Sequence, residues 1–551
     1  MNQVWLQNCD PLGNPLLSTL AAAAPVCVLF FFLAVRGAPA WRAAIYALAA
    51  AVAVALLVFR MPAAMVAGAV AGGLVFGWFR IAWIVVAAVF VYDVSVETGQ
   101  FETIKQSIGG ISDDRRLQVL LIAFAFSSLL EGAGGGGAPV AVCGAMMIGL
   151  GFPPFQTALI CLIANSAPVA FGALGNPLRI LAAVTGLGEA DFSAMVGRIL
   201  PLTMLVLPFW AMRVLCNRRD TLAVWPALVA CSLTFGGIQF FWSNYMNVSL
   251  VAIVGGIGTL LVLALFFRKV WSPKAIWRYG GEAPVRKKLP GESLTAGRIL
   301  LAWSPFLLLA AFVVLWGLPS VMRVLDKTSW MVPVPGLHMM VMRTPPVVVK
   351  PYAEPALFDV SWLSTSGTGI FFAGLVAALL GGLSLRRTLR VFSKSLARLA
   401  WSVVAIMAML GIGYVTRYCG MDATMGMAMA HTGALFPFFG TVIGWVGVAL
   451  SGTAAASNAL FGSFQVITAN KLGLSPILMG AANSAGGVMG KMVAAQSLVI
   501  GCAVTGQQGK EGLLFRAVLK HSLGLLALVG AIVMMYAYVF PRLIPSGHHF
   551  W

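Results

Sequence analysis

Two stretches of this sequence carry polar residues in a pattern that could bind an anion, although both stretches are otherwise apolar. In residues 118–188, Glu131 is followed closely by four consecutive glycines, and residues 433–506 contain Lys491. A helix that starts after such an interruption presents free N–H groups and the positive end of its dipole. We therefore expect a site for a small carboxylate. The expected binding residues are Gly135, Gly136, Gly137, Asn165, Ser166, Ser457, Asn458, Asn483, Ser484 and Lys491.

The few ionisable residues of these stretches have alternative roles. Glu131 is predicted to carry a proton, or else to cap backbone N–H groups. Lys491 could pair with the substrate or with Glu131, or could brace a carbonyl end. Arg179 lies nearer a helix end and is expected to brace or snorkel, and Lys471 is expected at the membrane interface. The Asn and Ser residues could bind the ligand or cap broken helix ends.

Composition identifies the class of protein that must position these residues. The chain has 551 residues, of which 60% are hydrophobic and 10% charged, whereas soluble domains average about 25% charged. Apolar runs of about 20 residues recur along it, each long enough to cross a bilayer. The net charge of +19 lies in short loops, which is typical of cytoplasmic loops rather than of a nucleic-acid-binding face. The sequence thus predicts a polytopic membrane protein and excludes a soluble enzyme.

No pattern in the sequence predicts catalysis or a bound cofactor. The eight cysteines are scattered singly, so neither a metal site nor a disulfide framework is expected. Residues 486–492 resemble a phosphate-binding loop only superficially, because the spacing is one residue short and Met492 replaces the required hydroxyl. We expect a protein that is not an enzyme and has no cofactor.

The basic segments predict how the chain crosses the membrane. Residues 268–298 and 386–398 are richest in Lys and Arg and are expected in the cytoplasm. Residues 100–117 and 217–220 are expected on the same side. Residues 320–358 then form an external loop. Arg80 is expected to separate two spans, 63–79 and 81–98, and the side of the amino terminus stays open.

The two unusual stretches are related to each other. Ala-Asn-Ser-Ala occurs at 164–167 and 482–485, and Ala-Val-Thr-Gly at 183–186 and 503–506. In each stretch a small-residue tip comes first and a crossing broken by Gly or Pro follows. Since the predicted orientation of the two stretches is opposite, they predict an inverted repeat of the kind found in secondary transporters.

The predicted fold is an all-α polytopic membrane protein with about a dozen transmembrane helices, two re-entrant hairpins and two broken helices. Its expected parts are N-terminal transmembrane helices (1–117), the first hairpin and broken helix (118–188), transmembrane helices (189–267), a basic cytoplasmic loop (268–298), a transmembrane helix (299–319), an extracytoplasmic loop (320–358), transmembrane helices (359–432), the second hairpin and broken helix (433–506), and a basic loop with the C-terminal transmembrane helix (507–551).

A family resemblance is carried by motifs that follow one another over nearly the whole chain. They include Asn8-Cys9-Asp10-Pro11, Leu130-Glu131-Gly132-Ala133, Ala167-Pro168-Val169-Ala170-Phe171-Gly172-Ala173, Ser457-Asn458-Ala459-Leu460-Phe461 and Gly490-Lys491-Met492. In these residues the chain resembles the bacterial L-lactate permease family of proton-linked carriers of lactate and glycolate. One departure is the second tip, Thr453-Ala454-Ala455-Ala456, where the family typically has Ser-Asp-Thr-Ser. Another is Asn176, where the family has an aliphatic residue.

The resemblance implies a multi-pass protein of the bacterial inner membrane that imports a small 2-hydroxymonocarboxylate by proton symport with alternating access. Its expected partners are the carboxylate, a proton and the lipid bilayer, with no nucleic acid, and an oligomer is compatible with the sequence. The alternatives are sodium coupling, an anion channel, or a carboxylate sensor that does not transport.

Overall fold

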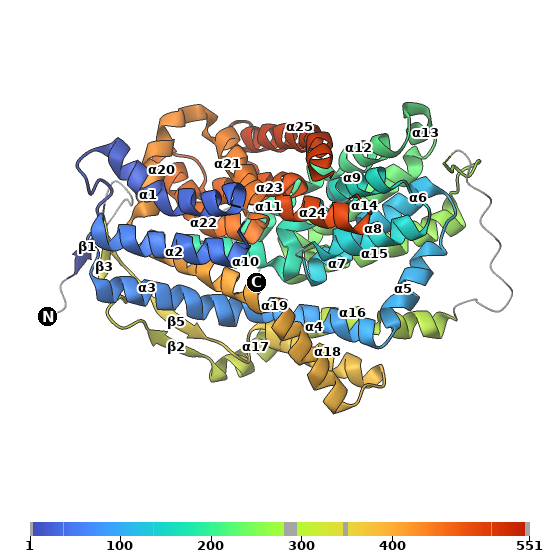
Figure 1. The fold of residues 1–551 in the computed structure, drawn as a ribbon, viewed down its shortest axis with the longest axis horizontal. Helices are drawn as coiled ribbons and strands as arrows, with labels where there is room; N and C mark the ends of the chain where they lie inside the picture. The colour runs from blue at the N-terminus through green and yellow to red at the C-terminus, as the bar shows by residue number, and fades with distance from the viewer. Residues whose placement is uncertain are drawn as a thin grey trace.

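The computed structural model is an elongated helical bundle in which many helices run along the long axis (Figure 1). It describes residues 4–36, 38–135, 137–279, 295–344, 351–507 and 510–545. Within these residues, ten helices are long and apolar enough to cross a membrane, or up to twelve if each of two bent helix pairs is one span. The predicted all-α polytopic membrane fold is confirmed.

The prediction of two spans meeting at Arg80 is wrong. Helix α3 (Ala63–Phe76) continues through a π-helical turn (Gly77–Ala82) into α4 (Trp83–Glu97), forming one 35-residue helix. Arg80 lies inside this helix, where its Nη2 donates a hydrogen bond of 3.1 Å to Ser361 Oγ. Because the protein itself solvates the charge, the helix need not end at the arginine.

The basic stretch 386–398 is also helical rather than a loop. Helix α19 (Leu385–Cys419) has 35 residues and includes this stretch in its first half. Lys, Arg and Leu favour helix, and neither Gly nor Pro interrupts these residues. Near the middle of the helix, Arg398 Nη2 lies 2.6 Å from Asp93 Oδ2 of α4.

Three segments predicted to be cytoplasmic meet at one end of the bundle. Arg116 Nη2 forms a 2.7 Å ion pair with Asp114 Oδ2, and Arg116 Nη1 donates to the carbonyl of Asp220 at 3.0 Å. The backbone N–H of Trp277 donates to Asp114 Oδ2 at 3.0 Å. These contacts agree with a shared side for the three segments. The basic residues 286–288 lie outside the described residues.

The predicted external loop contains strands that the sequence analysis did not predict. Strand β3 (Val341–Arg343) pairs with β1 (Trp5–Leu6) in parallel and with β4 (Tyr352–Glu354) in antiparallel orientation. Strands β2 (Trp330–Pro333) and β5 (Leu357–Val360) form a second, antiparallel pair. Because β1 joins this sheet, the amino-terminal segment lies on the same side of the bundle as the loop. This pairing places Trp5 and Leu6 beside that loop, whereas the sequence left the side of the amino-terminal segment open.

The two related stretches contain the same order of elements. In the first, α7 (Ser127–Ala133) and α8 (Ala138–Gly149) form a hairpin, and α9 (Pro154–Ala164) and α10 (Gly172–Thr185) belong to a helix pair bent by 63°. In the second, α21 (Phe436–Ser451) and α22 (Ala454–Leu472) precede a pair bent by 40°, which contains α23 (Pro476–Gly490) and α24 (Ala495–Val504). Helix α10 packs against α22, and α24 packs against α8. Each broken helix thus contacts the hairpin of the other stretch.

The remaining helices surround these elements. They are α1 (Pro15–Phe30), α2 (Ala40–Leu57), α5 (Gln100–Gly109), α6 (Arg115–Val119), α11 (Glu189–Met204), α12 (Leu207–Leu215), α13 (Arg218–Leu222), α14 (Trp225–Tyr245), α15 (Val251–Leu265), α16 (Ala296–Gly317), α17 (Pro319–Leu325), α18 (Ser366–Leu380), α20 (Met421–Met429) and α25 (Glu511–Tyr538). Short π-helical or 3₁₀ segments join several of them, including Leu120–Phe126 between α6 and α7 and Lys491–Val493 between α23 and α24.

Candidate functional site

Both hairpin tips turn on glycines with positive φ. At the first tip, φ is +59° at Gly135 and +93° at Gly137. A Cβ atom at Gly137 would lie only 2.4 Å from Ile500 Cδ1 of α24, so this tip fits closely against the second broken helix. At the second tip, φ is +81° at Gly452, and Thr453 Oγ1 accepts a hydrogen bond from the N–H of Ala456 at the start of α22. These tips end one helix and begin the next as the sequence analysis expected.

The first broken helix has an unusual backbone where it meets the first tip. Ala173, Leu174 and Gly175 have φ values of 43°, 60° and 77°. Non-glycine residues in this region each cost on the order of 1–2 kcal/mol, and such strain is concentrated at functional sites. A Cβ built on Gly135 would lie 3.4 Å from Ala173 Cβ. The strained turn therefore packs directly on the first tip.

Glu131 lies at the first tip and is 4% exposed. Asn165 Nδ2 donates to its Oε2 at 3.2 Å, and Asn165 Oδ1 accepts a 2.9 Å hydrogen bond from Ser127 Oγ. A Cβ at Gly172 would lie 2.7 Å from Glu131 Oε1, so only glycine leaves room for this carboxyl. The described residues give the carboxyl no hydrogen bond from a backbone N–H. Their contacts therefore do not support the capping alternative.

Lys491 lies in the break of the second crossing and is 5% exposed. Its Nζ donates a 2.7 Å hydrogen bond to the carbonyl of Gly452 in the second tip. Lys491 and Glu131 interact electrostatically, and the described residues form no direct ion pair between them. A buried acid from one stretch and a buried base from the other thus interact electrostatically without a direct contact.

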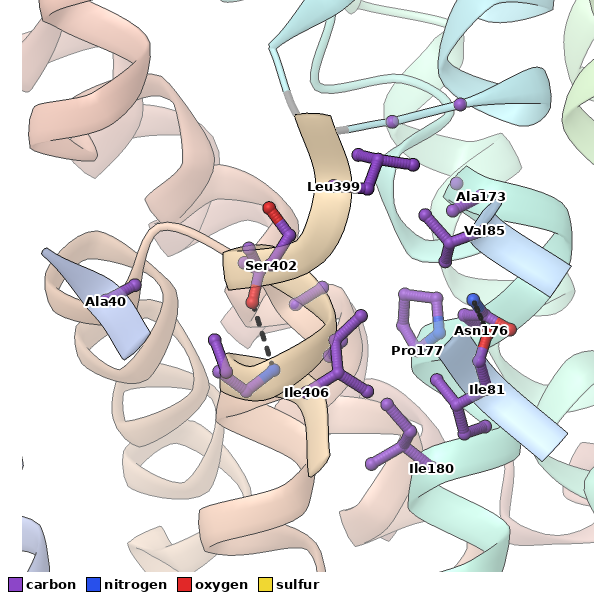
Figure 2. Close-up of a pocket in the computed structure, with 18 of the residues that line it drawn as sticks. Ala40, Ile81, Val85, Ala173, Asn176, Pro177, Ile180, Leu399, Ser402 and Ile406 are labelled. Carbon is purple, nitrogen blue, oxygen red and sulfur yellow. Dashed lines mark hydrogen bonds between the residues drawn. The ribbon is translucent and has the colours of Figure 1, made fainter. Parts of the chain in front are cut away.

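A cavity of about 650 Å³ lies between the two tips and the two broken helices (Figure 2). Of the expected binding residues, Gly135 and Lys491 line it, as does Glu131. The cavity extends along the basic half of α19 to Arg398 and Trp401. The side chain of Arg398 is 57% exposed, and Trp401 as a whole residue is 57% exposed. The cavity therefore reaches the surface toward the predicted cytoplasmic side.

The expected Asn and Ser residues lie behind this cavity and do not line it. Asn483 Nδ2 donates to Asn458 Oδ1 at 2.9 Å, and Asn458 Nδ2 donates to the carbonyl of Pro177 at 2.9 Å. Ser484 Oγ accepts from Asn458, Ser457 donates to Gly444, and Ser166 donates to Ile163. The bonds of Asn458 connect the second hairpin to both broken helices. Gly137 packs against Ile500 instead of lining the cavity, and Gly136 lies outside the described residues.

Asn176 lines the cavity but was not among the expected binding residues. It is 3% exposed, and its Nδ2 donates a 3.4 Å hydrogen bond to the carbonyl of Ile81. Its Oδ1 has no hydrogen-bond partner among the described residues. A buried acceptor without a partner costs free energy, so this oxygen is suited to a hydrogen-bond donor on a ligand. Its position just before Pro177, within an apolar helix, was the signal available in the sequence.

Much of the cavity wall is apolar. Ala454, Ala455 and Ala456 all line it, so the departure of the second tip from the resembling family falls in this wall. Ile81, Ile180, Ile406 and Leu410 also line the cavity. Figure 2 shows Ile81, Ile180 and Ile406 gathered beside Pro177. The site thus combines one buried acid, one buried base and one free acceptor with aliphatic surface.

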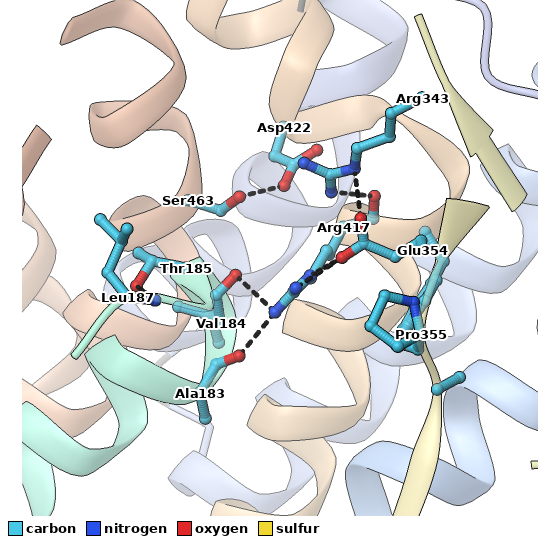
Figure 3. Close-up of polar contacts among 12 residues, drawn as sticks. Ala183, Val184, Thr185, Leu187, Arg343, Glu354, Pro355, Arg417, Asp422 and Ser463 are labelled. Atoms are coloured by element: carbon cyan, nitrogen blue, oxygen red, sulfur yellow. Dashed lines mark hydrogen bonds and ion pairs between the residues drawn. The ribbon is translucent and has the colours of Figure 1, made fainter. Parts of the chain in front are cut away.

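An ion network fastens the C-terminal end of α10 (Figure 3). Arg417 Nε donates to Glu354 Oε1 at 2.7 Å, and Arg417 Nη1 donates to the carbonyl of Ala183 at 2.7 Å. Arg343 Nε lies 3.0 Å from Glu354 Oε2, while nearby Asp422 accepts a hydrogen bond from Ser463. Burial alone would raise the pKa of the Glu354 carboxyl, but the charges of Arg417 and Arg343 lower it below its usual value. This carboxylate therefore stays ionised at mildly acidic pH.

Comparisons with known proteins agree with the sequence resemblance. The L-lactate permease family matches residues 18–540. The L-lactate permease of Escherichia coli (strain K12) is 41% identical over 550 residues, covering 98% of this chain and 100% of that protein. The glycolate permease GlcA of the same strain is 39% identical over 558 residues, with the same coverage. Among solved structures, MtrF of Neisseria gonorrhoeae is a distant match, with a TM-score of 0.43, 14% identity, and coverage of 85% and 83% of the two chains.

Proposed function

Because the chain belongs to the L-lactate permease family and is a multi-pass membrane transporter of small hydroxycarboxylates, we propose that it imports lactate, glycolate or a close relative by proton symport. The single observation that carries this proposal is the cavity between the two tips, which is lined by Glu131, Lys491 and Asn176. A carboxylate, a hydroxyl and a proton each have a matching group there.

Lys491 holds the carboxylate of the substrate. A negative charge deep in the membrane is costly unless a cation is close, and Lys491 is the buried cation of this cavity. Its Nζ has three N–H donors, and the Gly452 carbonyl takes one of them. The others can serve a carboxylate without breaking the contact with the second tip.

Glu131 takes up the proton that accompanies the substrate. A carboxylate that enters beside an ionised Glu131 is repelled, and protonation of Glu131 removes that repulsion. Binding of the anion and binding of the proton therefore favour each other. One proton and one monovalent anion then cross with no net charge.

Alternating access follows from the two related stretches. Each broken helix packs on the hairpin of the other stretch, as an inverted repeat with exchanged contacts would. The cavity reaches the surface near Arg398, while the Arg417 network fastens the outer end of α10. This arrangement is that of a carrier open toward the cytoplasm, and the opposite state requires release of that outer network.

Uptake into proteoliposomes tests the proposal. We expect labelled lactate or glycolate to accumulate when the lumen is more alkaline than the outside, and we expect no requirement for sodium. Uptake that is independent of the pH gradient but depends on a sodium gradient would indicate coupling to sodium instead of to protons. Flux without saturation or counterflow would indicate an anion channel, and binding without uptake would indicate a sensor.

Asn176→Leu is expected to weaken the preference for a hydroxyl group. In the wild type, propionate would leave Asn176 Oδ1 unpartnered, so lactate is preferred over propionate; leucine removes that oxygen. A neutral hydrogen bond contributes about 1 kcal/mol, so the ratio of half-inhibiting concentrations of propionate and lactate should fall about fivefold. Asn470→Leu, on the exposed end of α22, is the control. An unchanged ratio in Asn176→Leu contradicts the assignment.

A further inference from the structure

A second cavity lies beside the outer part of α10. It measures about 400 Å³, and its lining includes Arg80 of the long helix, Arg179 of α10 and Glu189 at the start of α11. Trp316 near the end of α16 and residues 364–366 after β5 complete the outer part of its wall. These last residues adjoin the external loop, so this cavity lies toward the outer end of the bundle.

An apolar cluster separates this cavity from the central one. Ile81 lines both cavities, and Ile180 lines only the central one. Together with Val184, Leu410 and Ala459 they form a buried hydrophobic cluster in which no residue is more than 3% exposed. On α10, residues 176, 177 and 180 face the central cavity, whereas residues 179, 182 and 183 face the outer one. The two cavities are thus neighbours across one layer of aliphatic side chains.

The charged groups of the outer cavity favour an anion. Arg80 and Arg179 provide two guanidinium groups, and Glu189 provides one carboxylate. Arg179 Nε lies 3.2 Å from Glu189 Oε1, and its Nη atoms donate to Ser366 Oγ at 3.3 Å and Ser249 Oγ at 2.5 Å. The Glu189 side chain is 39% exposed and that of Arg179 14%. A carboxylate ligand is a better acceptor than a serine hydroxyl, so it can take over these donors.

We propose that the outer cavity is a second binding site for the transported carboxylate, where Arg80 and Arg179 hold the anion before it passes the Ile81–Ile180 layer. This inference rests on the proposed function, because it assigns the outer cavity to the same substrate. Two cations at the outer mouth raise the local concentration of an anion and speed its capture. Bracing of α10 by Arg179, as the sequence analysis expected, is compatible with this role because Glu189 accepts from Nε, while the Nη atoms can exchange their serine acceptors for the ligand.

Uptake kinetics with external lactate test the outer site. Arg80→Gln and Arg179→Gln remove one cation each, and loss of one charge-assisted contact should raise the half-saturating external concentration about tenfold. The half-saturating concentration at the cytoplasmic face should not change. The maximal efflux rate should then fall about tenfold, because at equilibrium the ratio of maximal rate to half-saturating concentration must be the same in both directions. Added salt should raise the half-saturating external concentration of lactate in the wild type and have less effect on it in the variants.

Matched variants separate ligand binding from a structural role. Arg80→Lys and Arg179→Lys keep the charge and should recover most of the external affinity. Arg542→Gln removes an exposed charge near the carboxyl end and should have no effect. Equal changes at both faces, or no change at the external face, would overturn the outer site while wild-type uptake still supports the proposed function. Absence of uptake by the wild type would instead overturn the proposed function itself.

Discussion

Glu131→Gln is expected to abolish accumulation of lactate against its gradient. In the wild type, each unit of pH difference is worth about 1.36 kcal/mol, which supports about tenfold accumulation of a monovalent anion carried with one proton. Glutamine has nearly the same shape and can still accept from Asn165 Nδ2, but it cannot release a proton. The variant should therefore equilibrate lactate without concentrating it, so the accumulation ratio falls to about one.

Exchange of labelled for unlabelled lactate distinguishes loss of coupling from loss of folding. Exchange does not need the empty carrier to return, so Glu131→Gln should retain part of it. Glu102→Gln is the matched control, because Glu102 lies on helix α5 with its side chain 60% exposed. Tenfold accumulation by Glu131→Gln under a one-unit pH gradient would show that another group carries the proton.

Lys491→Met is expected to weaken substrate binding by at least about 30-fold, since removing one partner of a buried charge pair costs roughly 2–5 kcal/mol. Methionine keeps most of the length of the side chain and loses both the charge and the contact with the Gly452 carbonyl. The dissociation constant can be measured by scintillation proximity with labelled lactate on purified protein. Binding should fail for lactate and glycolate alike, because both present the same carboxylate.

Two companion variants interpret that result. Lys471→Met removes an exposed lysine at the end of α22 and should leave binding unchanged. Lys491→Gln keeps a hydrogen-bond donor for the second tip, so a monodisperse Lys491→Gln protein with weak binding assigns the loss to the charge. If Lys491→Met binds lactate as tightly as the wild type, the carboxylate must lie elsewhere.

The features that the sequence predicted well depend on local backbone chemistry. Four glycines cannot continue a stable helix, and Gly175 and Pro177 break the next one, so the tips and the bends were predictable from residue types. Arg80 shows the limit of this reasoning. Whether a charge ends a span depends on whether a partner such as Ser361 is present, and that partner lies 281 positions away in the sequence.

The candidate binding residues also divide into those that the sequence predicted and those that only the structure revealed. The sequence by itself determined the membrane class, the two interrupted stretches, and the presence in them of a single acid, Glu131, together with the base Lys491. Only the tertiary structure decided that Asn458 and Asn483 bond to each other behind the cavity while Asn176 faces it with a free oxygen. The physical reason is that left-handed residues at 173–175 redirect the following turn of α10, and neither that rotation nor the packing of α10 on α22 can be deduced from spacing along the chain.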